Sequence, residues 1–422
     1  MHHFIYKDNQ LFCESVAIAD IAEAVGTPFY LYSHATLTHH FNTFDKSFGE
    51  LPHLTCFAVK SCSNLAILRL FSTLGGGADI VSGGELYRSM KAGIDPRRII
   101  YSGVGKTEDE LRYGLVSGIL MFNIESEQEL EKLQEIAREQ EMVAPVSFRI
   151  NPDVDPKTHA YISTGLAKNK FGIPIDQAEK IYLRAKEMEH IRILGVSCHI
   201  GSQLTDISPF TEALHKVKLF VNRLETLGIS IDYLDLGGGL GVRYQDEKPP
   251  HPQEYARALS EEMEGLKCTL ILEPGRVIVG NAGILVSQVI YTKRTQAKNF
   301  IIVDAAMNDL ARPSLYDAHH DILPVIRKAG QAEEVLETAD VVGPICETGD
   351  FLAKDRQVTV FEQGDLVAVM SSGAYGFTMS SNYNSRPRAA EVLVKDDQFF
   401  IIRNRENYET LIRDENIPDF LE

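Results

Sequence analysis

A lysine ends the apolar run TCFAVK, residues 55–60, whose composition is typical of a buried β-strand. Burial disfavours the ammonium form of a lysine, and the neutral amine is a nucleophile. Taken alone, Lys60 is more simply explained as the point where a strand leaves the core and the ammonium reaches water. A catalytic interpretation needs further reactive residues at the ends of neighbouring strands.

Other candidates end similar apolar runs. Asp79 lies in ADIVS before the turn SGGEL, His199 follows GVSC, and Glu273 begins EPGR. Considered alone, Glu273 could form an ordinary salt bridge and His199 could be a hydrogen-bonded structural histidine. The case for a site therefore depends on a fold that brings these residues together.

The glycine run LDLGGGLGV, residues 234–242, is a candidate binding element. A dinucleotide fingerprint requires a helix directly after its glycines, but the RYQDEKPPHP that follows is polar, rich in proline and typical of a loop. A loop of bare backbone amides suits a phosphate group instead. By itself the motif is weak, because a glycine cluster is as often a tight turn.

The elements that would position these residues alternate regularly. β-like runs separated by amphipathic patterns such as SEQELEKLQEIAREQ predict βαβ units and a (β/α)8 TIM barrel. The runs are TCFAVK, ADIVS, RIIYSG, LMFNI, PVSFRIN, GVSCHIG, DYLDLGGG and LILEPGR. Such barrels assemble their sites at the C-terminal ends of the strands, so we expect Lys60, Asp79, His199, Glu273 and the glycine run to share one rim.

After Arg276 the pattern changes to alternating or apolar strands with few helices, which predicts a mostly antiparallel β domain. Its runs are GILVSQVIYTKR, NFIIVDAAM, DLVAVMSS, AAEVLV and QFFIIRN. We expect an α/β protein with a barrel over residues 33–281 and a β-sandwich or barrel-like domain from 1–32 and 282–422. The N-terminal segment is expected to supply an edge strand and a short helix to that domain.

Composition narrows the class of protein. The net charge of −17 over 422 residues argues against nucleic acid or an anionic membrane as partner. The first residues, MHHFIYKDNQ, lack the features of a secretion signal, and no apolar run approaches a membrane span, so we expect a cytoplasmic protein. The six cysteines form no CxxC, so we expect no disulfides and no metal site, and most thiols should be reduced and buried.

A lysine and a phosphate-binding loop on one rim predict pyridoxal 5'-phosphate, attached covalently to Lys60. Glu273 beside the pyridine nitrogen would keep that nitrogen protonated and strengthen the ring as an electron sink. The imidazole of His199 is suited to stack on the face of such a ring.

The chain resembles the diaminopimelate decarboxylases, within the alanine racemase-like, fold-type III group of pyridoxal phosphate enzymes. The resemblance covers nearly the whole chain through FAVKSCSN, GADIVSGGEL, SCHIGSQ, LDLGGGLG, EPGR, MNDLARPSLYDAHHDI, GPICETGD and GAYGFTMSSNYNSRPR. It implies decarboxylation of meso-2,6-diaminopimelate to L-lysine and CO2, the last step of lysine biosynthesis. The segment ARPSLYDAHH favours diaminopimelate over a diamine precursor.

The resemblance also implies roles for individual residues. Lys60 would bind the cofactor, with Asp79 near the lysine, His199 against the ring and Glu273 at its nitrogen. The cofactor phosphate would be surrounded by Ser202, Gly238, Gly239, Gly275, Arg276 and Tyr375.

The same resemblance implies a homodimer with active sites shared between subunits. Cys346 and Glu347 would enter from the partner subunit, the cysteine as proton donor and the glutamate as a substrate contact. The substrate's non-reacting end would be held by Arg276, Arg312 and Tyr316, since an arginine matches a carboxylate, and Tyr375 would be a further substrate-binding residue. Taken alone, a cysteine after VVGPI is more simply a small core residue.

One departure from the family pattern lies beside that cysteine. Thr348 stands where many relatives have serine, which keeps a hydroxyl group and adds a methyl group. The hydroxyl group of Thr348 can still form a hydrogen bond, whereas the effect of the added methyl group on the fit around the substrate is left open.

Three alternatives share parts of this pattern. An alanine racemase would place an arginine at the ring nitrogen, so Glu273 argues against it. An ornithine, arginine or carboxynorspermidine decarboxylase would share the lysine and the glutamate but would need acids in the distal pocket, where this chain has Arg312 and Tyr316. A non-catalytic protein that kept the fold is disfavoured by the joint presence of Lys60, Glu273 and Cys346.

Overall fold

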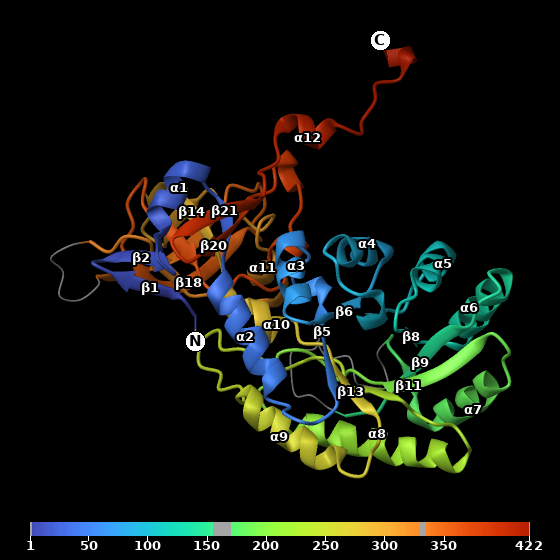
Figure 1. Ribbon diagram of the computed structural model, residues 1–422. Coiled ribbons are helices and arrows are strands. Elements are labelled where there is room, and N and C mark those ends of the chain that lie inside the picture. The colour runs from blue at the N-terminus through green and yellow to red at the C-terminus, as the bar shows by residue number, and fades with distance from the viewer. Residues whose placement is uncertain (1, 155–169, 329–334, 422) are drawn as a thin grey trace. The chain divides into compact units, whose positions relative to one another are not determined.

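The computed structural model describes residues 2–154, 170–328 and 335–421. The chain divides into two compact units, each considered by itself. The barrel unit comprises Thr38–Ile278, and the β unit comprises Met1–Leu37 together with Val279–Glu422. Figure 1 shows the helices and strands of both units with their labels.

In the barrel unit, eight parallel strands of the described ranges close on themselves, because β8 pairs with β9 and β13 pairs with β5. The strands are β5 (His53–Ala58), β6 (Gly77–Ile80), β7 (Ile99–Tyr101), β8 (Met121–Ile124), β9 (Ala144–Asn151), β11 (Ile191–Ser197), β12 (Tyr233–Asp235) and β13 (Thr269–Leu272). Each of them overlaps a predicted run, so the barrel prediction is confirmed, although β11 begins four residues before its run GVSCHIG. A further short strand, β10 (Ile173–Pro174), pairs with β9.

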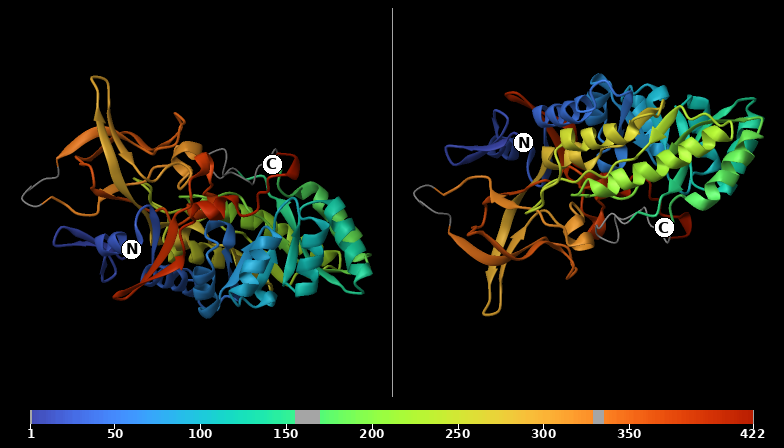
Figure 2. Two further views of the ribbon diagram at one scale, coloured as in Figure 1. Left: turned by 90° about the horizontal axis from the view of Figure 1, so that it is seen from above. Right: turned by 90° about the horizontal axis from the view of Figure 1, so that it is seen from below.

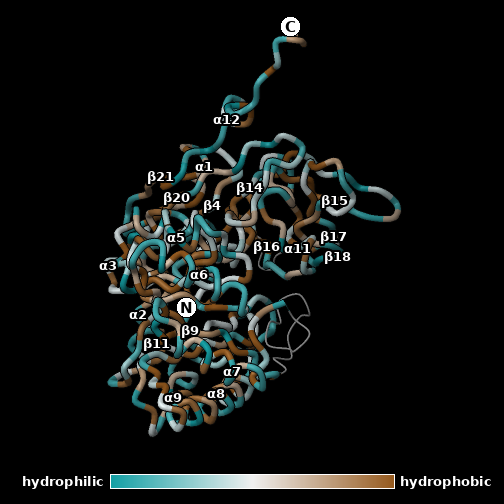
Figure 3. The backbone as a smooth tube through the Cα atoms, turned by 90° about the vertical axis from the view of Figure 1, so that its right-hand side faces the viewer, coloured by the Kyte–Doolittle hydropathy of each residue, from teal (hydrophilic) through white to brown (hydrophobic). Residues whose placement is uncertain are grey.

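Helices connect the barrel strands: α3 (Leu65–Thr73), α4 (Gly83–Lys91), α5 (Glu108–Ser117), α6 (Glu127–Glu139), α7 (Ile175–Lys186), α8 (Ser208–Thr226) and α9 (Pro252–Met263). Helix α2 (His34–Lys46) spans the division between the units. Local sequence sets these boundaries, as in α5, where Thr107 and Glu110 form a capping box and Gly118 ends the helix in the left-handed region at φ 68°. Hydrophobic and hydrophilic residues are interspersed along α8 and α9 (Figure 3), as expected for helices with one buried face.

The β unit is mostly antiparallel, as predicted. Its larger sheet has the order β18-β17-β15-β14-β4-β20-β21, with β16 paired to β19 and β19 to β14. The strands are β4 (Phe29–Ser33), β14 (Gly283–Arg294), β15 (Asn299–Val303), β16 (Ile322–Pro324), β17 (Leu336–Val342), β18 (Phe351–Thr359), β19 (Leu366–Val369), β20 (Ala390–Lys395) and β21 (Gln398–Arg403). A small sheet contains β1 (Phe4–Lys7), β2 (Gln10–Cys13) and β3 (Val16–Ala17). The helices of this unit include α1 (Ile18–Val25), α11 (Arg312–Tyr316) and α12 (Tyr408–Ile412).

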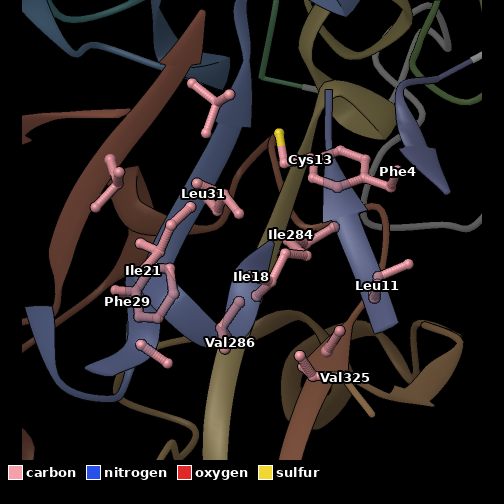
Figure 4. Packing of buried hydrophobic residues seen from close by; sticks show 14 of the residues in the cluster. Phe4, Leu11, Cys13, Ile18, Ile21, Phe29, Leu31, Ile284, Val286 and Val325 are labelled. Atoms are coloured by element: carbon pink, nitrogen blue, oxygen red, sulfur yellow. The ribbon is translucent and has the colours of Figure 1, made fainter. Parts of the chain in front are cut away.

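The expectation that the N-terminal segment supplies an edge strand is wrong for β4. This strand pairs with both β14 and β20, and all five of its residues are buried. The sequence FYLYS lacks the alternation of a half-exposed strand, which is the pattern of a strand covered on both faces. The side chains of β4 contribute to a cluster that gathers around Ile284 and Val286 of β14 (Figure 4).

The outer parts of the β unit are more extended. The antiparallel strands β14 and β15 form a protruding hairpin, drawn in gold and orange in Figure 2. The segment after α12 runs away from the sheets (Figure 1). Within the described ranges, no helix combines the length and the hydrophobicity required to cross a membrane.

Candidate active site

Lys60 lies in a short 3-10 turn, Val59–Ser61, directly after β5. Its Nζ donates a hydrogen bond to Oδ2 of Asp79 at 2.7 Å, and the carboxylate of Asp79, on β6, is fully buried. Because the lysine is partly covered and paired with a buried charge, its position is more constrained than that of a strand end in water.

A cavity of about 440 Å³ opens beside Lys60 at the C-terminal ends of the barrel strands. Its walls include three of the predicted residues, Lys60, His199 and Glu273, so the fold brings these three together. The remaining lining residues are Val81, Ser102, Gly103, Val104, Gly105, Asn123, Arg149, Phe171, Ser197, Cys198 and Asp235. The size and the few converging polar groups are typical of a small-molecule site.

Glu273 follows β13 and is buried in the wall of this cavity. Burial, and then the nearby charges of Asp235 and Asp79, raise the pKa of its carboxyl group well above the usual value. Among the described residues, its Oε1 has no hydrogen-bond partner. Such a buried oxygen is well suited to accept a hydrogen bond from a protonated nitrogen of a bound molecule.

A network of buried polar residues, which the sequence interpretation did not identify, supports Glu273. Asp235 accepts hydrogen bonds from Nδ2 of Asn123 at 2.7 Å and from the backbone of Gly237 at 2.9 Å. Ser147 in turn donates to Oδ1 of Asn123. These residues could have been recognised from the sequence, because Asn123 in LMFNI and Asp235 in LDL are polar residues within otherwise apolar runs. Burial raises the pKa of Asp235, so this group also favours its neutral form more than an exposed aspartate does.

The ring of His199 is held in one tautomer. The backbone N–H of Gly238 donates to its Nδ1 at 3.1 Å, so in the neutral ring the proton lies on Nε2. Burial lowers the pKa of His199 well below the usual value, and the charges of Arg149 and Lys60 lower it further. A neutral, oriented imidazole therefore lines the cavity, as stacking on a ring requires.

The glycine run after β12 passes close to other backbone segments. A Cβ atom at Gly238 would lie 2.1 Å from the carbonyl oxygen of Glu273, and one at Gly239 would lie 2.6 Å from that of Gly201. Gly239 also has a φ of 126°, which few other residues adopt. Side chains are therefore excluded here by backbone contacts, so an anion could approach this loop closely. The amides of Gly237 and Gly238 already donate to Asp235 and His199.

Arg276 and Ser202 lie together on the same side of the barrel. Nε and Nη2 of Arg276 lie 3.4 and 3.2 Å from Oγ of Ser202, and Nη1 donates to the hydroxyl of Tyr244 at 2.8 Å. Gly275 precedes this arginine, and a Cβ atom there would lie 3.0 Å from Oγ of Ser61. Tyr244 was not predicted, because it stands in a polar loop with no recognisable motif.

The other predicted site residues belong to the β unit. Cys346 is exposed, which argues against a core role, and its backbone N–H donates to Oδ1 of Asn384 at 2.9 Å. The hydroxyl of Tyr383 donates to Oε2 of Glu347 at 2.7 Å. The buried carboxylate of Asp350 accepts from the backbone of Ile345 at 2.7 Å. The loop that carries Cys346 and Glu347 is thus held from both ends.

Arg312 begins helix α11 and Tyr316 ends it. Ser314 of this helix donates to the carbonyl of Gly349 at 2.6 Å, which ties α11 to the loop of Cys346. Tyr375 lies in the turn GAYG with a φ of 55°, a left-handed conformation that is uncommon for tyrosine and is found more often at functional sites.

The barrel unit fits pyridoxal phosphate in three respects. A lysine amine lies on the cavity, a buried carboxylate oxygen is open for the pyridine nitrogen, and a glycine loop that excludes side chains leaves room for the phosphate. Fold and site together define a pyridoxal phosphate enzyme built on a (β/α)8 barrel. A family model described as "Pyridoxal-dependent decarboxylase, pyridoxal binding domain" matches residues 34–280.

Similar proteins narrow the class. A diaminopimelate decarboxylase of Pseudomonas aeruginosa is 53% identical and covers 99% of both chains. The solved diaminopimelate decarboxylase of Helicobacter pylori, in complex with L-lysine, is 42% identical with a TM-score of 0.90 and covers 94% of this chain and 98% of its own. That of M. jannaschii, also with L-lysine, is 39% identical with a TM-score of 0.94 and covers 100% of both. The chain belongs to the diaminopimelate decarboxylase family of pyridoxal-dependent decarboxylases.

Proposed function

We propose that the chain decarboxylates meso-2,6-diaminopimelate to L-lysine and CO2, the last step of lysine biosynthesis. The observation that carries the proposal is the cavity in which Lys60 and the open carboxylate oxygen of Glu273 line one space. The names of the relatives support the substrate, and the lysine bound in two of them is the product expected from it.

Residues of the barrel unit would hold the cofactor. Lys60 would bind its aldehyde carbon, Glu273 its ring nitrogen and His199 one face of its ring, while Asp79 keeps the lysine in place. The phosphate would be bound by Ser202, Gly238, Gly239, Gly275 and Arg276, with Tyr375 of the β unit. When bound, pyridoxal phosphate supplies an electron sink for the pair left behind as a carboxyl group departs.

The chain's own residues complete the reaction. The bond between the α-carbon and its carboxyl group breaks, CO2 leaves, and the electron pair stays with the α-carbon. Cys346 then donates the proton of its thiol to that carbon, and a proton from solvent restores the thiol. Glu347, held by Tyr383, contacts the substrate beside it.

The active protein is a cytoplasmic homodimer in this proposal. Cys346 and Glu347 of the partner subunit complete each site, while Lys60 belongs to the first subunit. Arg276, Arg312 and Tyr316 bind the carboxylate at the substrate's non-reacting end, with Tyr375 beside them. An arginine suits this task because its planar fork matches a carboxylate with two hydrogen bonds.

A carbon dioxide release assay over a panel of diamino acids tests the function. The cofactor-loaded protein is expected to release CO2 from meso-2,6-diaminopimelate at least about 10²-fold faster, in kcat/KM, than from L-lysine, L-ornithine or L-arginine, which lack the distal carboxylate. Equal turnover of L-ornithine would favour a diamine-forming decarboxylase, and preference for carboxynorspermidine would favour a carboxynorspermidine decarboxylase. No CO2 from any substrate, with cofactor bound, would contradict the proposal.

Arg312→Ala is expected to lower kcat/KM for diaminopimelate by roughly 10²-fold, about 3 kcal/mol, because the distal carboxylate loses its partner. Arg312→Lys should recover only part of this loss, since a lysine lacks the fork. Steady-state kinetics measure both variants, with Arg413→Ala, an exposed arginine of the same unit, as the matched control. Unchanged kcat/KM in Arg312→Ala would assign the distal carboxylate to other residues.

A further inference from the structure

A buried histidine in the β unit contacts Arg312. His320 lies between α11 and β16 and has no exposed surface within the described structure. Its Nδ1 is 2.8 Å from the carbonyl oxygen of Met370, and its Nε2 is 3.0 Å from Nη1 of Arg312. The backbone at Met370, directly after β19, and the guanidinium of Arg312 are therefore joined through one imidazole.

The two partners determine the protonation of this ring. A carbonyl oxygen can only accept, so Nδ1 of His320 carries the proton and donates it to Met370. A guanidinium can only donate, so Nε2 is the acceptor for Arg312. Both hydrogen bonds are satisfied only by the neutral ring with its proton on Nδ1.

Neighbouring charges favour the same neutral form. Nη1 of Arg356 donates to the backbone carbonyl of His320 at 2.9 Å and lies 3.1 Å from Nε2 of His319. His319 in turn lies 3.0 Å from Oδ1 of Asp321. A protonated His320 would place a second positive charge 3.0 Å from the guanidinium of Arg312, and like charges at such a distance repel.

We propose that His320 is a positioning residue that orients Arg312 for the distal carboxylate of the substrate. A carboxylate in its place would also hold the guanidinium, but it would neutralise the charge that the substrate has to meet. A neutral acceptor holds one N–H of Arg312 without neutralising the charge of its guanidinium. The selectivity for a substrate with two carboxylates thus depends on a residue that does not touch it. This inference rests on the proposed function.

Two variants of His320 separate its two hydrogen bonds. In His320→Gln the amide oxygen replaces Nε2 as the acceptor for Arg312, whereas His320→Asn keeps a donor near Met370 and loses that acceptor. His320→Asn is expected to raise KM for diaminopimelate about tenfold with kcat within about twofold, and to lower the preference over L-ornithine by a similar factor. His320→Gln should recover most of the parent KM. His319→Gln, the neighbouring histidine, is the matched control and should leave KM unchanged.

Cofactor content and thermal unfolding show whether each variant folds, and the NMR measurement below carries the test if His320→Asn does not fold. A fall in kcat without a change in KM or preference would overturn the positioning role, as would unchanged kinetics in His320→Asn.

Histidine-selective ¹⁵N NMR of the cofactor-loaded parent adds a readout independent of turnover. A signal with a protonated Nδ1 and a bare Nε2, lost in His320→Gln, supports the contact, and the opposite tautomer contradicts it. Absence of diaminopimelate turnover in the parent, with that tautomer present, would refute the proposed function and the selectivity role but leave the contact established.

Discussion

Lys60→Ala is expected to reduce decarboxylation by roughly 10⁴-fold or more, because it removes the amine that, in the proposed function, binds the cofactor and releases the product. The parent protein, loaded with pyridoxal phosphate, should absorb at about 420 nm. Reduction with borohydride should attach the cofactor to the protein irreversibly. A peptide map of the reduced protein should place the adduct on Lys60. The variant should show neither the fixed adduct nor turnover.

Lys60→Arg separates the charge of the lysine from its reactivity. An arginine keeps a cation beside the buried carboxylate of Asp79, so the ion pair that supports this part of the barrel can persist. It cannot bind the cofactor aldehyde, and it should therefore be as inactive as the alanine variant. Lys132→Ala, an exposed lysine on α6, is the control that should retain full labelling. An adduct on a lysine other than Lys60 would refute the assignment.

The barrel could be predicted from the sequence because its strands are nearly continuous apolar runs. A parallel strand covered on both faces has to be apolar along its length, so a polar residue at its end stands out. Lys60, His199 and Glu273 are such residues, and the structure places them on one cavity. Because the sites of such barrels lie at the C-terminal ends of the strands, these separate residues could be predicted to share one site.

The residues that sequence reasoning missed depend on partners far along the chain. Asn123 reaches Asp235 across 112 positions, and Arg276 reaches Tyr244 across 32. His320 stood within a quoted motif, but its role is evident only from the carbonyl of Met370 and the guanidinium of Arg312. Pattern and spacing describe how a residue relates to its own strand or helix, whereas these contacts are set by the packing of several elements.

The error at β4 has a related cause. The prediction of an edge strand rested on the place of the N-terminal segment before the first barrel strand. In the structure β20 pairs with β4 in parallel and β14 pairs with it antiparallel, so both of its neighbours come from the C-terminal third of the chain. Strand order in a sheet is set by such long-range pairing, which local sequence does not encode.

A second large effect is expected on the activity of mixed dimers, and it shows whether one active site uses residues from two subunits. Lys60 belongs to the barrel unit and Cys346 to the β unit, so the two could meet within one chain or across a two-fold interface. Lys60→Ala and Cys346→Ala should each be nearly inactive as homodimers. The two variants can then be mixed under conditions that allow subunits to exchange.

If Lys60 and Cys346 of each site come from different subunits, a mixed dimer carries both defects in one site and leaves the other site intact. Random exchange at equal concentrations makes about half of the dimers mixed, and each has one working site of two, so activity should rise to about a quarter of the parent value. If the two residues meet within one chain, every site carries a defect and exchange restores nothing. Differently tagged variants, recovered together in a pull-down, show that exchange has occurred. Confirmed mixed dimers without activity would therefore exclude a shared site.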